Sequence, residues 1–312
     1  MNTASFPHGI MFHHFWDHRH PAGQGAIGAD DLVRLLRYLG PARILKAEDW
    51  LERAVAGRLE PHHLCLTFDD ALLCQYDVAL PVLDDFGLTA FWFIYSSVFE
   101  GQLRKMEVYR YLRTVAYPTV DDFYAHFEEV LGGSRYGDMA AQATAGFDPR
   151  RYLAEFPFYT DADRRFRFLR DRVLGHDPFE EIMDILVERA GLQAERLRHL
   201  LWMEDAHLKG LDDRGHVLGL HSYTHFTTLG EMSYAEQQRE YLTNRRHLIA
   251  VTGHVPRAMA HPCNSYNQDT VAILDELGVE IGFRSNMVGA QGSRFELPRQ
   301  DHALVMAEME DR

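Results

Sequence analysis

The sequence predicts an α/β protein of the barrel type, with catalytic groups placed where strands end. Two polar motifs carry this prediction: residues 67–70 read Thr-Phe-Asp-Asp, and residues 221–225 read His-Ser-Tyr-Thr-His. Each motif follows a short apolar run of strand type, residues 64–66 and 217–220. Catalytic groups at the C-terminal ends of strands are the arrangement that an α/β barrel presents.

The N-terminal third alternates between strand and helix patterns. Residues 9–15 are predicted to form a first strand, and a loop rich in His, Gly and Gln follows over 17–28. Leucines then recur at helical spacing, and Asp30 or Asp31 is placed to cap that helix. The four leucines are Leu32, Leu35, Leu36 and Leu39.

Two further elements follow the first motif. Residues 81–87 predict a helix that ends at its glycine. Residues 89–95 are rich in residues that favour strands and predict a buried strand. After residue 204 the alternation resumes, with a helix, the strand before the second motif, and a helix over 234–252. The predicted elements that complete the chain are a strand at 257–260, a helix at 269–277 and a strand at 279–283.

The middle of the chain departs from this alternation. The stretch from Asp69 to His221 is far longer than one strand–helix–strand unit requires. Its apolar residues recur mostly at helical spacing: Phe123, Phe127 and Val130, then Phe179, Ile182, Met183, Ile185 and Leu186. We therefore expect one barrel domain over 1–312, with residues 101–200 inserted as a helical cap that shapes access to the site.

The insertion contains a dense basic cluster. Its members are Arg164, Arg165, Arg167, Arg170 and Arg172. One interpretation is a solvated helix face. The other is a phosphate clamp for a nucleotide- or lipid-diphosphate-linked sugar, because arginine matches the geometry of phosphate.

Composition narrows the class of protein. The chain has 312 residues, 46% apolar and 25% charged, as in an ordinary globular protein that can bury an ample core. Its formal charge of −14 argues against a nucleic acid or an anionic membrane as partner, because both require a positive surface. The first residues lack a basic region and an apolar signal core, no apolar run is long enough to span a membrane, and the three cysteines form no disulfide framework. We expect a cytoplasmic protein.

The two motifs together supply the ligands of an open catalytic metal site. Asp70, His221 and His225 offer one carboxylate and two imidazoles, which leaves positions for water and substrate. The two histidines are expected one helical turn or a similar step apart, so that both face one ion. Zn²⁺ suits this set best, and Co²⁺, Ni²⁺, Mn²⁺ and Fe²⁺ are alternatives. Asp69 is then free to act as a general base on water held at the metal.

These motifs resemble those of a known family. Thr-Phe-Asp-Asp followed by His-Ser-x-Thr-His resembles the first two motifs of the polysaccharide deacetylases (carbohydrate esterase family 4, the chitooligosaccharide deacetylase-like group), over about residues 9–100 and 200–302. The resemblance implies a distorted (β/α)7-type barrel and a metal-dependent hydrolase that removes N-acyl groups from amino sugars. It implies the same roles for Asp69, Asp70, His221 and His225.

The third family motif is altered here. Residues 260–266 read Ala-His-Pro-Cys-Asn-Ser-Tyr, where relatives carry an arginine, a proline and aromatic residues. The arginine is missing, and His261 and Cys263 stand in the places of two aromatics. We expect Arg299 to replace that arginine by pairing with Asp69 and keeping it ionised.

The catalytic acid is assigned only to a group of candidates. Relatives use a late histidine, for which His302 and His261 are the first candidates here. His18 and His20 of the N-terminal loop are the second candidates. Cys263 is expected to form a wall of the pocket, although a nucleophile or a fourth ligand is an alternative. We expect the substrate to contact Cys263, His18 and His20. His14 is also expected to contact it, and the alternative for His14 is a histidine buried in the core.

The sequence thus predicts a hydrolase that removes an acetyl or formyl group from an amino sugar or an activated amino-sugar precursor, within lipopolysaccharide or capsule biosynthesis. The partner is a small or carrier-linked acylated amino sugar, and the oligomeric state stays open. The alternatives are a hydrolase of O-acyl esters or non-sugar amides, and a catalytically silent barrel that binds carbohydrate.

Overall fold

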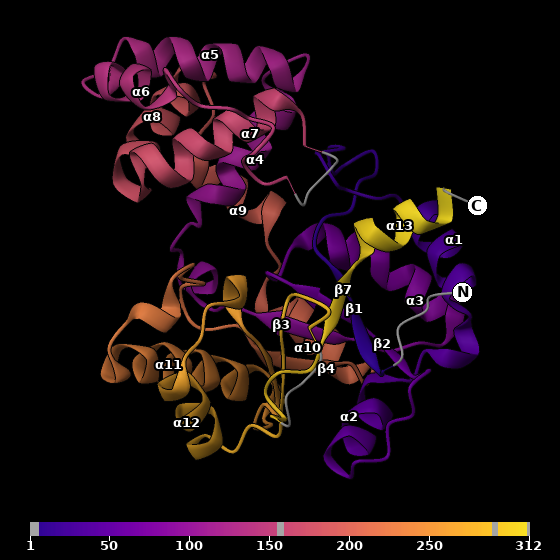
Figure 1. Cartoon of the computed structure of the whole chain (residues 1–312). Coiled ribbons are helices and arrows are strands. Elements are labelled where there is room, and N and C mark those ends of the chain that lie inside the picture. Colours follow the sequence, from indigo (N-terminus) through magenta and orange to yellow (C-terminus); the bar gives the residue numbers. More distant parts are fainter. Residues whose placement is uncertain (1–5, 155–158, 289–292, 311–312) are drawn as a thin grey trace. The chain divides into compact units, whose positions relative to one another are not determined.

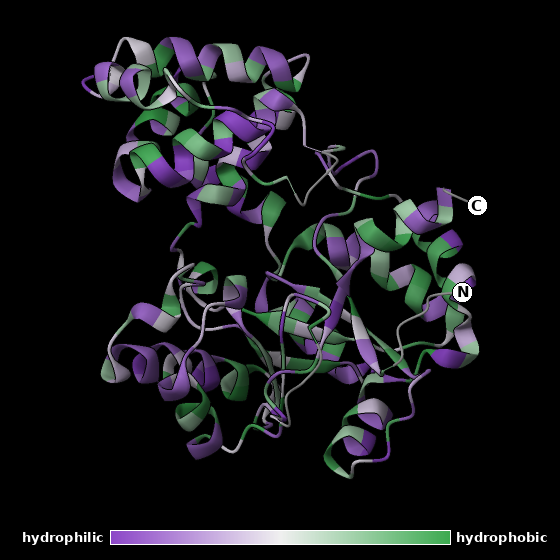
Figure 2. Ribbon diagram, viewed as in Figure 1, coloured by the Kyte–Doolittle hydropathy of each residue, from purple (hydrophilic) through white to green (hydrophobic). Residues whose placement is uncertain are grey.

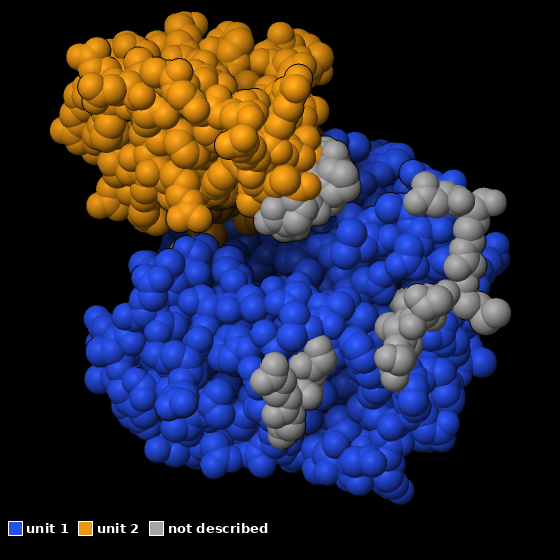
Figure 3. Space-filling model, in the orientation of Figure 1, with its two compact units in different colours: residues 1–103, 198–312 blue, residues 104–197 orange. Residues whose placement is uncertain are grey.

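The computed structural model describes residues 6–154, 159–288 and 293–310. The chain divides into two compact units, one formed by residues 1–103 and 198–312 and the other by residues 104–197 (Figure 3). The second unit is therefore inserted in the sequence of the first, between the two polar motifs. Among the described residues, none of the helices is both long and apolar enough to cross a membrane.

The first unit is built on a parallel sheet (Figure 1). Its strands within the described residues are β1 (His8–Phe12), β2 (Leu64–Asp69), β3 (Phe91–Ile94), β4 (Val217–Leu220), β5 (Ala258–Ala260), β6 (Ile281–Phe283) and β7 (Arg299–Asp301). They pair in parallel in the order β6-β5-β4-β3-β2-β1-β7. A parallel bridge between Phe283 and Leu297 links the end of β6 to the segment before β7. The seven strands therefore nearly close a barrel, which confirms the predicted distorted (β/α)7-type fold.

Helices connect and cover these strands. Those of the first unit are α1 (Ala29–Leu39), α2 (Ala47–Val55), α3 (Leu80–Phe86), α10 (Asp205–Asp213), α11 (Tyr234–Thr252), α12 (Gln268–Glu276) and α13 (His302–Glu310). The leucine face of α1 is buried as its spacing predicts. Its capping residue is Gly28, whose N–H donates to the carboxylate of Asp31 in the first turn. The cap expected at Asp30 or Asp31 therefore lies two or three residues earlier in the chain.

Aromatic packing fixes the barrel core. Trp50 of α2 lies edge-on to Phe91 at 6.0 Å and against Phe283 at 5.3 Å, so the helix is held to two strands at once. Gly219 of β4 lies close to the ring of Phe93 and to the backbone of Ala258. A Cβ there would lie 2.6 Å from the ring of Phe93 and 2.8 Å from the carbonyl oxygen of Ala258, so only glycine fits this position.

The second unit is helical and has its own core. Its helices are α4 (Lys105–Val115), α5 (Val120–Gly132), α6 (Gly137–Thr144), α7 (Asp161–Phe168) and α8 (His176–Arg189), with a π-helical turn η4 (Leu169–Leu174), and α9 (Ala194–Leu201) contains its boundary. Phe166 packs against Phe123, Phe127 and Phe179 at centroid distances of 5.3, 4.9 and 5.9 Å. Figure 2 shows hydrophobic and hydrophilic residues alternating along these helices. Ile185 is 39% exposed and lies off the buried face of α8, contrary to the grouping expected from sequence.

The first strand is shorter than its sequence predicts. β1 ends at Phe12 rather than at residue 15, because the chain turns there and Phe15 pairs instead with Ile27. His13 and His14 therefore leave the sheet at its C-terminal edge. The strand predicted at 89–95 is shortened at both ends, to β3, and the strand predicted at 279–283 is shortened at its start, to β6.

Candidate active site

Three side chains from the two polar motifs meet at the C-terminal ends of the strands. Asp70 directly follows β2, and His221 directly follows β4. Oδ1 of Asp70 lies 3.5 Å from Nε2 of His221 and 3.3 Å from Nε2 of His225. One ligand atom from each residue lies within 4.8 Å of the others, which is a spacing that one metal ion can bridge.

Left-handed backbone turns place these side chains. Asp70 and Ala71 have φ of 78° and 56°, and Ser222 and His225 have φ of 62° and 54°. Such conformations cost non-glycine residues of the order of 1–3 kcal/mol and are concentrated at functional sites. The two histidines are therefore not one helical turn apart. A sharp loop brings both rings to the same carboxylate instead.

Hydrogen bonds hold that loop. The N–H of His225 donates to Oγ of Ser222 at 3.0 Å. The carboxylate of Glu240 accepts from the N–H groups of Tyr223 and Thr224 at 3.0 and 2.7 Å. Three backbone donors are thereby satisfied in a segment that has no regular structure, so the loop is fixed by α11, on which Glu240 lies.

The ring of His221 is oriented for ligation. Its Nδ1–H donates to the carbonyl oxygen of Ala260 at 2.8 Å, and its backbone N–H donates to Oδ1 of Asn244 at 3.0 Å. Since the proton is on Nδ1, the lone pair of Nε2 points toward Asp70. A hydrogen bond of this kind fixes the tautomer and the ring orientation of metal-binding histidines.

The residues present fit a divalent cation. Oδ1 of Asp70 is buried and accepts no hydrogen bond from the described residues, although ring nitrogens of His221 and His225 lie 3.5 and 3.3 Å from it. Burial favours the neutral acid, but the adjacent imidazoles of His225 and His221 hold the pKa of this carboxyl below its ordinary value. A buried carboxylate beside two ring nitrogens is a donor set that suits a divalent cation.

Asp69 lies beside this group and is held by an arginine. Nη1 and Nη2 of Arg299 donate to Oδ1 and Oδ2 of Asp69 at 2.7 and 2.8 Å, and Nη1 also donates to Oγ1 of Thr67 at 3.2 Å. Arg299 is 1% exposed, and its Nε donates to the carbonyl oxygen of Arg284 at 2.7 Å. Burial alone would raise the pKa of Asp69, but the guanidinium holds that pKa below its usual value. Asp69 is therefore an ionised buried carboxylate next to the ligand group.

The structure adds His13, which the sequence analysis did not select. Its Nε2 lies 3.8 Å from Oδ2 of Asp69 and 4.0 Å from Oδ2 of Asp70, and its side chain is 30% exposed. Its position directly after β1 is the signal that identifies it, because the carboxyl ends of parallel strands share one edge of the sheet. His14 stacks on His13 at a centroid distance of 6.3 Å.

The two histidines proposed as the acid are buried against backbone carbonyls. Nε2–H of His261 donates to Phe295 O at 2.8 Å, and burial lowers the pKa of this ring to about 3. The ring nitrogens of His302 lie 3.1 and 3.3 Å from Gly25 O and Met11 O, and burial lowers its pKa too. The ring of His261 is thereby kept neutral, and both rings are engaged by backbone carbonyl oxygens.

The remaining predicted contacts lie in two loops. His20 is buried, and its Nε2–H donates to the carboxylate of Asp77 at 2.8 Å, which ties the N-terminal loop to η2 (Gln75–Ala79). The side chain of His18 is 85% exposed. Cys263 is exposed at φ 48° within the short 3-10 helix η6 (Pro262–Asn264), which follows β5.

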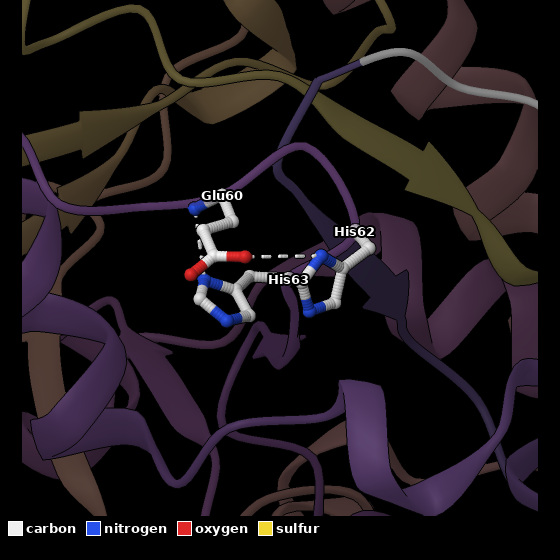
Figure 4. A group of neighbouring side chains, drawn as sticks. All are labelled: Glu60, His62 and His63. Carbon is white, nitrogen blue, oxygen red and sulfur yellow. Dashed lines mark hydrogen bonds and ion pairs between the residues drawn. The ribbon is translucent and has the colours of Figure 1, made fainter.

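A second group of metal-capable side chains lies at the opposite end of β2. Glu60, His62 and His63 come from one loop before that strand, and a carboxylate oxygen of Glu60 lies 3.5 Å from Nδ1 of His62 (Figure 4). Nδ1 of His63 accepts the N–H of Glu60 at 2.9 Å, so the proton of the neutral ring is on Nε2. Neither nitrogen of His63 then offers a free lone pair. We conclude that this group stabilises a turn.

Comparisons with known proteins give a matching family pattern and similar folds. The family described as "Polysaccharide deacetylase" matches residues 194–282, the stretch that contains His221 and His225. None of the curated proteins matches the chain. The fold is similar to that of the deacetylase PplD of Streptococcus pyogenes, solved in complex with acetate, with a TM-score of 0.54, 14% identity, and 95% and 91% of the two chains covered.

Two other solved structures are similar to the same degree. IcaB from Ammonifex degensii has a TM-score of 0.53 at 15% identity, with 95% of this chain and 91% of that chain covered. The deacetylase domain of BpsB from Bordetella bronchiseptica has a TM-score of 0.53 at 15% identity, with 94% of each chain covered. The resemblance of this chain to the polysaccharide deacetylases is thereby confirmed, by their sequence pattern over residues 194–282 and by their barrel fold.

Proposed function

We propose that this chain is a metal-dependent hydrolase that removes an acetyl or formyl group from the nitrogen of an amino sugar. The observation that carries the proposal is the group of Asp70, His221 and His225, with the ionised carboxylate of Asp69 beside it. A ligand set with a neighbouring base is the arrangement that metal-assisted amide hydrolysis requires.

Asp70, His221 and His225 would hold the cation. Nitrogen and oxygen donors without sulfur suit Zn²⁺ at a catalytic site, and Co²⁺, Ni²⁺, Mn²⁺ and Fe²⁺ also suit this donor set. Such a cation, when bound, supplies Lewis-acid chemistry: it polarises a carbonyl oxygen and makes water easier to deprotonate.

Asp69 takes the proton from the attacking water. Each oxygen of an ionised carboxylate has two lone pairs, so the bidentate bond with Arg299 leaves one on each for this proton. Arg299 acts through Asp69: it keeps the carboxyl ionised and fixes its plane.

His13 donates a proton to the leaving amine. Its Nε2 lies 3.8 Å from Oδ2 of Asp69, and its side chain is 30% exposed, which leaves room for substrate. An amide nitrogen leaves only after it is protonated, so a proton donor on the side of the leaving group is required. We propose His13 for this role ahead of His261 and His302, whose rings donate to backbone carbonyls.

The substrate is proposed to be an N-acylated amino sugar or its activated precursor, handled within the cell. Support comes from similarity in fold to deacetylases, one of which was solved with acetate. Helices α4–α8 are proposed to shape access to the site, as long insertions at a barrel rim do.

A panel of acylated sugars tests the proposal. The purified protein, loaded with Zn²⁺ or Co²⁺, is assayed for acetate or formate release from N-acyl and O-acyl sugars, free and nucleotide-linked. We expect release from an N-acyl sugar, its loss in Asp69→Asn, and its retention in Asp85→Asn, which removes the same charge from an exposed position. Release from O-acyl sugars alone would replace the proposal with an esterase, and a loaded protein without turnover would replace it with a carbohydrate-binding barrel.

A further inference from the structure

A cavity of about 170 Å³ lies within the helical unit of residues 104–197, and arginines form its charged wall. Arg110 and Arg113 come from α4, Arg167 from α7, and Arg170 from η4. The rest of the lining is mostly aromatic and methionine side chains. The cavity is therefore a positively charged hollow with an apolar wall.

Arg167 has an unsatisfied donor at this place. Its Nε is buried and has no hydrogen-bond partner among the described residues. Its guanidinium lies 4.0 Å from the ring centroid of Tyr159, which supports the cation from one face only. Burial and then the like charges of Arg170 and Arg113 lower its pKa, although Tyr159 opposes this. A buried donor without an acceptor is costly unless a ligand supplies one.

The charges in the cavity are only partly neutralised. Arg170 forms a bidentate pair with Asp171. Neither Arg113 nor Arg167 forms an ion pair with a carboxylate in the part of the chain that the structure describes. Glu107 is the acidic side chain that the described lining includes. Arg113 and Arg167 thus bring positive charge to the cavity that no described carboxylate pairs with.

The other arginines of the basic cluster have different roles. Arg164 is buried and donates to the carbonyl oxygens of Tyr159 and Tyr152. Arg165 pairs with Glu128, and Arg172 is exposed. Neither of the two interpretations drawn from sequence therefore describes the whole cluster: two of its five members join two arginines of α4 around the cavity.

We propose that this cavity binds the phosphoryl group of a small phosphorylated ligand. Guanidinium groups match phosphate oxygens in pairs, and Arg167 Nε is a donor that finds no acceptor among the described residues. The volume equals roughly five to six water molecules, which suits the five heavy atoms of a phosphate. It is below the range of about 300–1,000 Å³ that encloses larger ligands, so the organic part lies outside. This inference is independent of the proposed hydrolase activity, because every lining residue is in residues 104–197.

Calorimetric titration with inorganic phosphate tests the proposal on the full chain in phosphate-free buffer. The variants are Arg113→Gln and Arg167→Met, with Arg172→Gln as the matched control from the same segment. We expect saturable binding by the wild type, at least tenfold weaker binding by both cavity variants, and affinity within twofold of wild type for the control. Absence of saturable binding, or equal binding by all four proteins, would overturn the proposal.

Thermal unfolding separates a binding role from a structural one. Arg167→Met removes a partly buried cation that lies near like charges. We therefore expect the ligand-free variant to melt at or above the wild-type temperature and to lose the upward shift with phosphate. A lower Tm with the phosphate shift intact would assign Arg167 to packing on Tyr159 and overturn the proposal. Phosphate also stabilises proteins without a site, but that rise does not saturate and is shared by every variant. If Arg167→Met does not fold, Arg113→Gln decides the outcome.

The source of the phosphoryl group is distinguished by three further titrants at matched ionic strength: pyrophosphate, uridine diphosphate and geranyl diphosphate. Tighter binding of the uridine or the geranyl compound than of pyrophosphate identifies a nucleotide or an isoprenoid carrier. Equal binding of all three assigns the cavity to the phosphoryl group alone.

Discussion

Arg299 and Asp69 are 230 positions apart in the sequence, yet they form two parallel hydrogen bonds of 2.7 and 2.8 Å in the barrel core. The pair links β7 to β2 across β1, which lies between them in the sheet. Because both side chains are almost fully buried, each is the other's principal counter-charge. The proposed base therefore depends on a residue from the far end of the chain.

Arg299→Met should impair both activity and stability. Loss of the guanidinium leaves Asp69 as a buried, uncompensated carboxylate, which costs about 3–5 kcal/mol in the free energy of unfolding. The pKa of Asp69 should rise, so the acidic limb of the kcat/KM profile should move to higher pH. Urea unfolding and a pH–rate profile measure the two effects. A profile identical to that of the wild type would show that Arg299 does not act through Asp69, and Arg299→Lys should give an intermediate shift.

His13→Ala should lower turnover of an N-acyl sugar by about 10²- to 10⁴-fold, the contribution usual for general acid catalysis. The loss should be small on an aryl acetate, whose phenolate leaves without protonation. Metal content should be unchanged, because Asp70, His221 and His225 remain. Comparing the two substrates on the same preparation isolates the step, and an equal loss on both would assign His13 to another role.

His216 should make stability depend on pH. Its Nδ1 accepts from the N–H of Ala90 and from Nε1–H of Trp92, and burial lowers its pKa to about 4. The unfolded state binds a proton below its ordinary pKa of about 6.5, whereas the folded state does not. Stability is therefore full above pH 6.5 and falls as the pH decreases toward 4.

The corresponding variant is His216→Gln, whose amide oxygen can accept the same two hydrogen bonds without titrating. Between pH 7 and pH 5 the wild type should lose about 2 kcal/mol more unfolding free energy than the variant. Urea denaturation at the two pH values gives this difference. Parallel losses in both proteins would show that His216 titrates normally in the folded state.

Cys263→Ser should leave kcat within about threefold of the wild type. The side chain is exposed on η6, and the proposed reaction uses no thiol. A serine keeps the size and the backbone conformation of the position. A loss above a hundredfold would restore the alternative that Cys263 is a nucleophile or a ligand.

Local patterns in the sequence predicted most of the barrel. β4 and α11 begin and end at the predicted residues, because apolar runs and helical spacing act over a few neighbours. Both polar motifs were located by the same signal, an apolar strand followed by charged or imidazole side chains.

The rest depends on tertiary structure. His13 follows a strand that ends three residues early, so its sequence neighbourhood did not mark it as a site residue. The turn that joins His221 to His225 depends on Ser222 at φ 62° and on Glu240 of α11, which no spacing rule contains. The cavity of the helical unit likewise combines arginines of α4 with Arg167 and Arg170, which are more than fifty positions away.

The metal content of the purified protein tests the central claim most directly. Wild type, His221→Ala and, as a control from the second histidine group, His62→Ala are purified without chelators or an affinity tag and analysed by plasma mass spectrometry. We predict about one equivalent of divalent metal in the wild type and in His62→Ala, and almost none in His221→Ala. Equal metal in all three proteins, or none in any after incubation with Zn²⁺ or Co²⁺, would contradict the account.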